Sequence, residues 1–460
     1  MLQLLDGSVV APPPPVGNVW YDQLPAGDLL NNVQAPTGAN AISLYGDFTV
    51  QIQGQNVPVY LVNVARDGTG YPDGGVNNQR PIGLCNFDTT GSVVVTVTVF
   101  NRTVTSYAVK TTPYGVQPTS SRSGNTITVN VPHYGKYIVQ INGSEDNWLC
   151  LFCSPPEEAA PTGNVITYGP GIYTPGRVTL AANTTVWIKA GAVVHGSFIV
   201  PNAGCTIRGR GILCDLLDPT SGSTHFLETS GTGFTYEGFT MVGGQPFNIR
   251  MPGASYGLID NVKIFSARSN SDAMDPTRAH HITIQNVFSC NWDDWVTLKD
   301  DGGTSCHDIL VQDSMTMTRS GWRLMGFGAE GGGDIYNVTF KKIYALWTHA
   351  MNILHTETPD NPSLHDFLWE DITIEGHHGH QQTGLDPTTR FIQLGNDGGN
   401  SPHTNFTFRR VSLNGILPPS GLHNQCNGIH FEDLYVNGVK MMSDSSWNMS
   451  RNGAANVTYA

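Results

Sequence analysis

The chain has 460 residues, of which 13% are charged, and a formal net charge of −13. This length predicts roughly two to three domains. The sequence has no apolar run of about 18 residues, which argues against a transmembrane helix. The acidic balance argues against nucleic-acid binding, which requires clustered Lys and Arg. A count of 52 glycines, together with abundant Asn, Thr and Ser, is typical of a turn-rich all-β protein.

The N-terminal region contains short runs in which apolar and polar residues alternate, including FTVQIQG, VPVYLVNV, SVVVTVTVF, NTITVNV and KYIVQING. Gly, Pro, Asn and Asp separate these runs. Short strands of this kind predict an antiparallel β-sandwich domain over residues 1–155. The stretch 154–164, rich in Pro, Glu and Ala, then indicates a linker.

The region after the linker, residues 165–460, repeats one pattern: an apolar–x–apolar run, two polar residues and a second apolar–x–apolar run. Copies are GLIDNVKIF, HITIQNVFS, NVTFKKIYA, DFLWEDITI, NFTFRRVSL and GIHFEDLYV. Equivalent apolar residues lie 23 residues apart in Phe239 and Val262, and 25 apart in Val262 and Val287. Short strands with a period in the low twenties predict a right-handed parallel β-helix, whose coils stack about 4.7–4.9 Å apart.

Cysteines and glycosylation sequons are less informative. Cys150 and Cys153 form a single C-x-x-C pair, and without a second pair a zinc site is not expected. Cys205 and Cys214 are candidates for a local disulfide, and the redox state stays open. Seven sequons give a weak indication of glycosylation in a chain so rich in Asn and Thr; they start at Asn101, Asn142, Asn183, Asn337, Asn405, Asn448 and Asn456.

Acidic residues concentrate in NSDAMDP (270–276) and NWDDWVTLKDD (291–301). Asp272 and Asp293 are 21 residues apart, close to one coil, so Asp272 is expected roughly 5 Å from the pair Asp293–Asp294. The adjacent pair requires a strand end or a corner, because neighbouring residues of a strand face opposite sides. Clustered carboxylates separate one another's pKa values. An acid beside a water-activating carboxylate is the arrangement that glycoside hydrolysis uses.

Turn formation is the competing interpretation, because Asp side chains readily bond nearby backbone N–H groups. We favour it for Asp275, which precedes a proline, and for Asp300 and Asp301, which precede two glycines. For the other three aspartates the spacing alone leaves both interpretations open.

The segment NSDAMDPTRAHHITIQNVFSCNWDDWVTLKDDG resembles the central motif of the polygalacturonases, glycoside hydrolase family 28, in which N-T-D-G-x-D-P is followed one coil later by G-D-D-C-I-A-I-K-S-G. The stretch NWLCLFCSPPEEAAPTGNVITYGPGIYTPG is similar to the junction between sandwich and β-helix in the dextranase and isopullulanase group, family 49. The first match covers Asn270, Asp272, Asp275, Pro276, Asp293, Asp294 and Lys299.

The resemblance implies a role for each matched residue. Asp293 would be the general acid. Asp272 and Asp294 would hold and deprotonate the attacking water, which gives inversion at the anomeric carbon. Lys299 and Asn270 would line the substrate cleft or order the aspartates. Such enzymes need no metal or other cofactor, and the partner implied is a polysaccharide or oligosaccharide.

Two departures from the family pattern bear on the substrate. Trp322 stands where the polygalacturonase G-H-G motif has His, and it is the aromatic residue best placed to stack on a sugar. Asn352 and His355 stand in place of the R-I-K motif that binds a uronate carboxylate. A neutral or atypical glycan is therefore expected. Arg323 is an alternative anion contact, and Glu330 is either a supporting acid or part of a Gly-rich loop.

Other functions remain open. One is a pectin hydrolase that binds uronate through Arg323, and another is a non-catalytic glycan-binding adhesin. A β-helix lyase would need a Lys, Arg or Tyr base, which fits the clustered acids less well. The run GHHGH (376–380) is interpreted as a solvated loop, and no metal is expected.

The N-terminus, MLQLLDGSVVAPPPP, is not a recognisable signal peptide. A secreted protein is nevertheless expected, with the signal peptide absent from this chain. We expect the sandwich to shield the end of the β-helix and not to bind glycan.

Overall fold

The structure is a computed structural model that describes residues 19–21, 42–64, 80–144, 148–214, 225–243, 247–266, 270–291, 293–300, 304–318, 323–327, 333–346, 352–356, 363–377, 390–395 and 401–460. Within these ranges every regular element is a β-strand, which confirms the all-β prediction. No helix in this part of the chain is long and apolar enough to cross a membrane.

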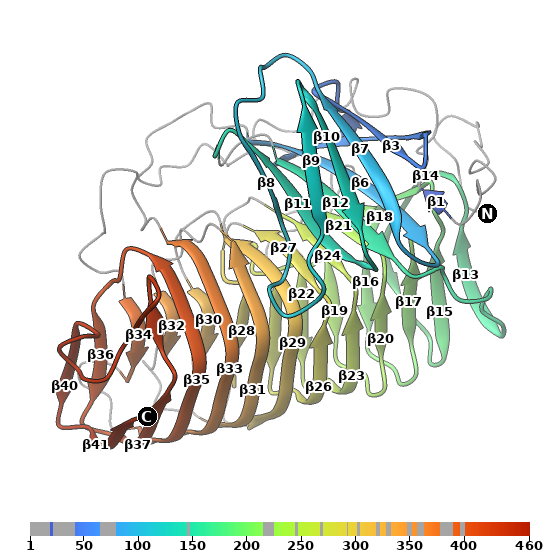
Figure 1. The fold of residues 1–460 in the computed structure, drawn as a ribbon. Coiled ribbons are helices and arrows are strands. Elements are labelled where there is room, and N and C mark those ends of the chain that lie inside the picture. Colours follow the sequence, from blue (N-terminus) through green and yellow to red (C-terminus); the bar gives the residue numbers. More distant parts are fainter. Residues whose placement is uncertain are drawn as a thin grey trace.

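The N-terminal strands form two sheets that face each other (Figure 1). One sheet has the order β2-β5-β6-β12-β11-β8, with β1 paired to β6, and the other has the order β4-β3-β7-β10-β9. All the pairings are antiparallel except that of β6 with β12. The strands are β1 (Val19–Tyr21), β2 (Ile42–Leu44), β3 (Phe48–Ile52), β4 (Gln55–Val57), β5 (Tyr60–Val64), β6 (Arg80–Thr89), β7 (Val93–Val99), β8 (Tyr107–Lys110), β9 (Thr119–Ser123), β10 (Thr126–Val131), β11 (Gly135–Ile141) and β12 (Trp148–Ser154).

Alternation explains how these strands become a sandwich. Strand β7 reads VVVTVTV, and every second residue is buried. Its inward residues Val95 and Val97 contact the inner face of the other sheet, which includes Val139 and Leu151. The two sheets thus enclose their own apolar core, as the alternating pattern predicts.

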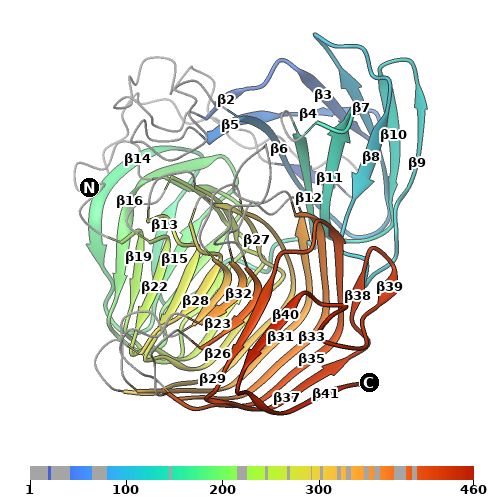
Figure 2. The same cartoon turned by 90° about the vertical axis from the view of Figure 1, so that its left-hand side faces the viewer.

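The second region is a right-handed parallel β-helix, as predicted (Figures 1 and 2). Its 29 strands form one continuous sheet. They are β13 (Asn164–Tyr168), β14 (Gly171–Thr179), β15 (Thr184–Ile188), β16 (Ala192–Val200), β17 (Thr206–Gly209), β18 (Ile212–Cys214), β19 (Leu227–Thr229), β20 (Thr235–Glu237), β21 (Thr240–Val242), β22 (Ile249–Pro252), β23 (Ser255–Asp260), β24 (Lys263–Phe265), β25 (Met274–Thr277), β26 (His280–Gln285), β27 (Phe288–Asn291), β28 (Val296–Leu298), β29 (Cys306–Thr318), β30 (Arg323–Phe327), β31 (Asp334–Leu346), β32 (Asn352–Thr356), β33 (Ser363–His377), β34 (Arg390–Leu394), β35 (His403–Gly415), β36 (Ser420–His423), β37 (Cys426–Glu432), β38 (Tyr435–Val436), β39 (Val439–Lys440), β40 (Met449–Asn452) and β41 (Ala455–Tyr459).

Stacked apolar residues fill the interior of the β-helix. Except for the antiparallel pair β38–β39, the described strands pair in parallel with their equivalents in the next coil, so that Ile259 lies beside Ile284 and Ile284 beside Val311. These residues are fully buried in one core that runs through the β-helix. The repeat follows because no coil can bury its apolar face alone.

The two polar residues of the repeat form a corner of each coil. The second of them has a positive φ, between 50° and 57°, which turns the chain from one strand into the next. Asn and Asp tolerate this left-handed conformation better than other non-glycine residues, and they occupy most of these corners, which are Asn261, Asn286, Asp313, Lys342, Asp371, Arg410 and Asp433.

The sandwich covers one flank of the β-helix (Figure 1). The expectation that it shields the end of the β-helix is wrong, because its contacts reach from Val193 to Leu346 along the side. Trp148 and Phe152 of the sandwich enter a shared apolar cluster there. A buried ion pair adds to the contact, since Nε of Arg210 lies 3.0 Å from both carboxylate oxygens of Asp88.

All eight cysteines are buried, and the structure places none of them in a disulfide. Cys205 and Cys214 therefore do not form the local disulfide considered above. The Cys205 thiol instead donates to the carbonyl oxygen of Ala181, at 3.2 Å.

Candidate active site

The three aspartates singled out in the sequence lie on two successive coils. Asp272 lies two residues before the start of β25, while Asp293 and Asp294 occupy the gap between β27 and β28. Met274 of β25 pairs in register with Val296 of β28, which places the two segments side by side. The pair is outside regular strand, so both side chains can be directed to the same side.

Asp293 is a buried carboxyl held by backbone donors. The N–H of Asn270 donates to one carboxyl oxygen and the N–H of Asp294 to the other, each at 3.0 Å. Burial is the main reason that the pKa of Asp293 rises to about 7, and the charge of Asp294 raises it further. The backbone hydrogen bonds and the guanidinium of Arg323 oppose this rise. Asp293 therefore keeps a proton at mildly acidic pH.

Asp294 is only 1% exposed and is fixed as an acceptor by three donors. The Thr297 hydroxyl donates to Oδ2 at 2.7 Å, and the backbone N–H of Arg323 donates to Oδ1 at 2.7 Å. The Arg323 guanidinium lies 2.8 Å from Oδ2. A Cβ at Gly326 would come within 2.9 Å of the Arg323 side chain, so glycine keeps space for this approach.

Asp272 shares one ammonium group with Asp275. Nζ of Lys299 lies 3.4 Å from Asp272 and 3.6 Å from Asp275. Burial is the main reason that the pKa of Asp272 lies well above its ordinary value. The nearby negative charges of Asp275, Asp293 and Asp294 raise that pKa further, and the lysine opposes them.

Asp275 corrects the turn interpretation. It lies inside β25, is fully buried and faces Lys299, which a turn aspartate would not do. Met274, which precedes Asp275 in β25, and Met251 of the previous coil, which pairs with Pro276, point into the core. Because successive residues of a strand face opposite sides, Asp275 faces outward. Asp300 is also fully buried.

The charges of this cluster do not cancel. Asp272, Asp275, Asp293 and Asp294 would carry four negative charges when ionised, and Lys299 and Arg323 supply two positive ones. The net charge would be −4 + 2 = −2 in a buried environment. Raised pKa values at two of the carboxyls are the expected response to that excess.

Two buried asparagines support the irregular backbone beneath the carboxylates. Nδ2 of Asn291 donates to the carbonyl oxygens of Asp293 at 2.6 Å and Asp294 at 2.7 Å. Nδ2 of Asn248 likewise donates to the carbonyl oxygen of Asp272, at 3.0 Å. Neither asparagine was predicted from the sequence. For Asn291, its place at a strand end beside an acidic pair was a detectable signal.

Of the remaining predicted residues, the structure describes Arg323, Asn352 and His355 but not Trp322 and Glu330. Arg323 opens β30, and the backbones of Asn352 and His355 in β32 pair with Arg323 and Gly326, respectively. Arg323 therefore belongs to the coil that follows Asp294, and Asn352 and His355 belong to the coil after that one. Trp322 and Glu330 lie outside the described residues, so their predicted roles are not addressed.

Known structures share this fold, although no family model and no curated sequence matches the chain. Dex49A from Penicillium minioluteum superposes with a TM-score of 0.58 and 14% identity, over 98% of this chain and 100% of that chain. The Yersinia enterocolitica family 28 exopolygalacturonase gives a TM-score of 0.48 and 11% identity, over 80% and 96%. The catalytic domain of a GH87 alpha-1,3-glucanase in complex with nigerose gives 0.46 and 11%, over 92% and 87%. The superposition on Dex49A confirms the resemblance to dextranase- and polygalacturonase-like β-helix proteins as a likeness of fold.

Proposed function

We propose that this protein is a glycoside hydrolase that cleaves O-glycosidic bonds in a polysaccharide or oligosaccharide. The observation that carries the proposal is the environment of Asp293. This carboxyl has a pKa of about 7 and lies next to Asp294, a carboxylate fixed by Arg323. A protonated acid beside a held acceptor meets the chemical requirement of glycoside hydrolysis. The shared fold with Dex49A is consistent with it.

In the proposed reaction Asp293 gives its proton to the glycosidic oxygen as the bond from that oxygen to the anomeric carbon breaks. Water attacks the anomeric carbon and transfers a proton to the carboxylates of Asp294 and Asp272. The leaving sugar gains the proton of Asp293, and the new hydroxyl comes from water. We assign inversion of configuration on the resemblance to the polygalacturonases.

A neutral glycan is the proposed substrate class. The two cations at the carboxylates already have acidic partners, since Lys299 lies between Asp272 and Asp275, and Arg323 is bound to Asp294. Using Arg323 to hold a uronate would remove the positive partner of Asp294. This argues against the pectin-hydrolase alternative, in which Arg323 binds the substrate carboxylate.

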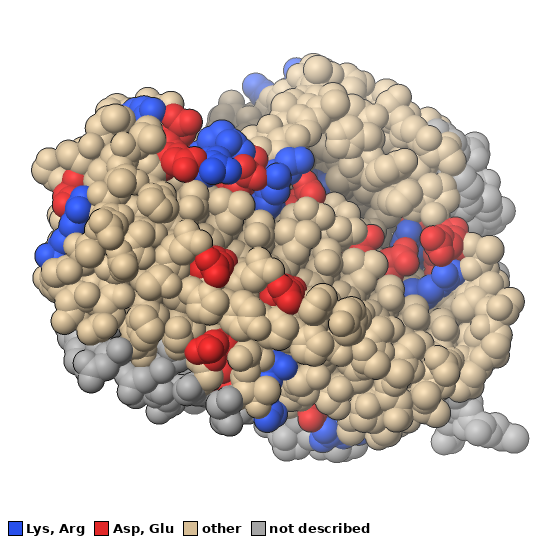
Figure 3. Space-filling view, turned by 90° about the horizontal axis from the view of Figure 1, so that it is seen from below, with Lys and Arg blue, Asp and Glu red and all other residues tan. Residues whose placement is uncertain are grey.

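We further propose that the protein acts outside the cell, where polysaccharides are found. Nucleic acid is not a proposed partner. On the face shown in Figure 3, basic side chains occur beside acidic ones and form no broad basic area. Arg410, for example, lies 2.8 Å from Glu370 and 2.6 Å from Asp371.

The test is release of reducing sugar from dextran, pullulan, polygalacturonate, rhamnogalacturonan, arabinan and galactan. Wild type is compared with Asp293→Asn, and Asp366→Asn on the outer surface is the matched control. We expect release from a neutral glycan that falls by about 10²–10⁴-fold in Asp293→Asn, because a general acid contributes that much. The control should match wild type.

The other outcomes separate the alternatives. Release from polygalacturonate alone would overturn the neutral-glycan proposal. Release that is equal in wild type and Asp293→Asn would overturn the role of Asp293. Glycan binding on an array without release from any bound glycan would support the adhesin. The anomer first released, followed by proton NMR, tests inversion.

A further inference from the structure

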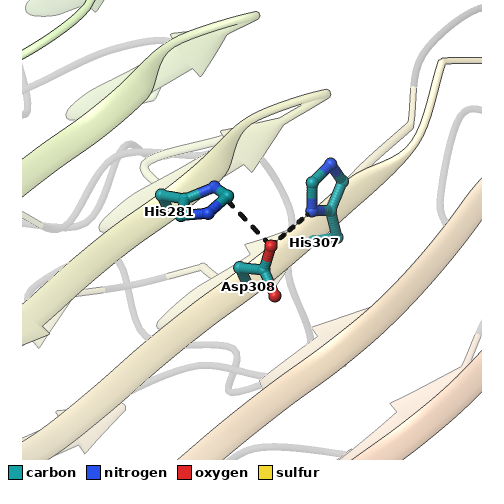
Figure 4. Close-up of side chains that lie close together, drawn as sticks. All are labelled: His281, His307 and Asp308. Carbon is teal, nitrogen blue, oxygen red and sulfur yellow. Dashed lines mark hydrogen bonds and ion pairs between the residues drawn. The ribbon is translucent and has the colours of Figure 1, made fainter.

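A second cluster of chemically active side chains lies away from the carboxylates, at a corner of the β-helix (Figure 4). His281 belongs to β26, and His307 and Asp308 belong to β29 of the next coil. Nδ1 of His307 lies 2.8 Å from Oδ2 of Asp308, and Nδ1 of His281 lies 3.6 Å from the same oxygen. The ligand atoms that the three residues offer lie within 4.8 Å of one another.

His281 and Tyr256, its equivalent on the preceding coil, have positive φ although neither is Asn, Asp or Gly. The pairing of His280 with His307 places His281 beside Asp308, and both have a φ of 56°. The equivalent residues of the following coils are Asn337 and Asp366, which suit this left-handed conformation. Turning the chain therefore does not require a histidine here.

Stacked rings hold both imidazoles. The ring of His281 stacks on Tyr256, with centroids 4.6 Å apart. The ring of His307 lies between His280, at 5.1 Å and 7°, and Tyr336, at 4.7 Å and 5°. Ligand side chains that are fixed before binding lose less freedom when they take up an ion.

A second His–Asp pair in the same protein provides an internal comparison. His365 contacts Asp366 at 2.7 Å, just as His307 contacts Asp308. In both pairs an Asn of the next coil donates to the Asp. The difference is on the preceding coil, where the pair at 365–366 meets Asn337 in the place that His281 takes at the first pair. A third ligand is thus present at only one of these two pairs.

We propose that His281, His307 and Asp308 bind one divalent transition-metal ion of the Zn²⁺ type, with water in the remaining position. Two imidazole nitrogens and one carboxylate oxygen form a donor set that zinc accepts. Tetrahedral bonds of about 2.0–2.1 Å separate ligand atoms by about 3.3 Å. The 2.8 Å and 3.6 Å distances bracket that value, and the three ligand atoms lie within 4.8 Å of one another, so the two imidazoles would need to approach each other by at most about 1.5 Å. Nδ1 of His307 would bind the ion through its lone pair, with the ring proton on Nε2.

The ion would link β26 to β29 and thereby join two successive coils. These are the strands that follow β25, which Asp272 precedes, and β28, which Asp294 precedes. Binding to the folded state alone raises its stability through mass action. The site is therefore a metal-dependent link between the coils, independent of the proposed hydrolase chemistry.

The experiment uses the full chain without an affinity tag, cleared of metal and titrated with ZnCl₂ in a calorimeter. Thermal unfolding with and without Zn²⁺, and the visible spectrum of the Co²⁺ complex, are measured on the same samples. The variants are His281→Asn and Asp308→Asn, whose new residues suit the left-handed corner, and the matched control is His365→Asn.

We expect wild type and His365→Asn to bind about one equivalent of Zn²⁺ and to unfold at a higher temperature when it is present. His281→Asn and Asp308→Asn should each lose that equivalent and the thermal shift, while circular dichroism shows the same fold. An absence of stoichiometric binding in wild type would overturn the proposal. Undiminished binding in His281→Asn would do so as well, because the ion would then be held elsewhere, for instance by residues 376–380.

Discussion

Two outward faces of the β-helix bury residues of different kinds. Under the sandwich, the in-register row of Cys214, Val242, Phe265, Cys290 and Met317 is apolar. On the face of the candidate site, the corresponding outward row is polar or charged.

That second row includes Arg250, Asp275 and Thr297. Burying charge costs free energy unless it is paired. Burying an apolar row on this face would cost less free energy, as it does under the sandwich. The contrast fits a first face that docks the sandwich and a second face that holds the proposed active site.

The largest expected effect on stability comes from a substitution on the docking face, which is the face that the sandwich covers. Phe288 is fully buried, and its ring centroid lies 4.9 Å from that of Phe152 in the sandwich. Phe288→Ala should lower the free energy of unfolding by about 3–5 kcal/mol, because a cavity replaces the ring. Urea titration measures the change. The exposed Tyr256→Ala is the control, and a loss below about 1 kcal/mol would show that the sandwich contributes little.

The next effect concerns the free energy of unfolding that is lost by burying the Asp293 carboxyl. Between pH of about 4 and about 7 the folded protein keeps the Asp293 proton that the unfolded chain has lost. The free energy of unfolding should therefore fall as pH rises through that window. Asp293→Asn removes this dependence and should be more stable than wild type above pH 7, by up to about 4 kcal/mol.

Denaturant titrations of both proteins at pH 4 and pH 8 measure this difference. The two should be closely similar at pH 4, where the carboxyl is protonated in the folded state and about half protonated in the unfolded chain. A variant that is less stable than wild type at pH 8 would contradict the raised pKa of Asp293.

A smaller effect tests the role of Arg323. This residue lowers the pKa of Asp293 and forms an ion pair with Asp294. Arg323→Gln should move the alkaline limb of kcat/KM to higher pH by up to about one unit, and kcat should fall. Arg177→Gln is the control, since Arg177 pairs with Glu228 on a half-exposed surface. If Arg323→Gln left the limb unmoved while kcat fell, Arg323 would act on Asp294 alone.

The smallest effect tests the corners. Asn405 has a φ of 61° and donates to Asp366 of the preceding coil. Asn405→Ala should cost about 1–2 kcal/mol, because alanine is strained in the left-handed region. Asn405→Gly should cost less, as Gly428 already occupies the equivalent place one coil later. Equal losses in a thermal unfolding series would show that the hydrogen bond, and not φ, matters.

The corners show how far sequence patterns reach. The two polar residues of each repeat predicted the bends because Asn and Asp favour positive φ. The same physics accounts for the sequons, since all seven sequon asparagines have φ between 51° and 61°. Three of them, Asn337, Asn405 and Asn456, donate their side-chain amides to the preceding coil. Backbone geometry thus suffices to explain these asparagines.

The candidate site was only partly predictable. Spacing placed Asp272 one coil from Asp293, and the adjacent pair required the strand gap that is found. The contacts of Lys299 and Arg323 with the carboxylates depend on side-chain directions across different coils, which spacing does not encode. The docking of the sandwich on the flank was missed for a similar reason, although the outward-facing apolar residues Phe265, Phe288 and Cys290 were a local signal.

The most direct test of the central claim compares two leaving groups in wild type and Asp293→Asn. One substrate is the glycan that the enzyme cleaves, and the other is an aryl glycoside of the released sugar whose phenol needs no protonation. If Asp293 is the proton donor, the variant should lose about 10²–10⁴-fold in kcat on the glycan and little on the aryl glycoside. Equal losses on both substrates would contradict that role.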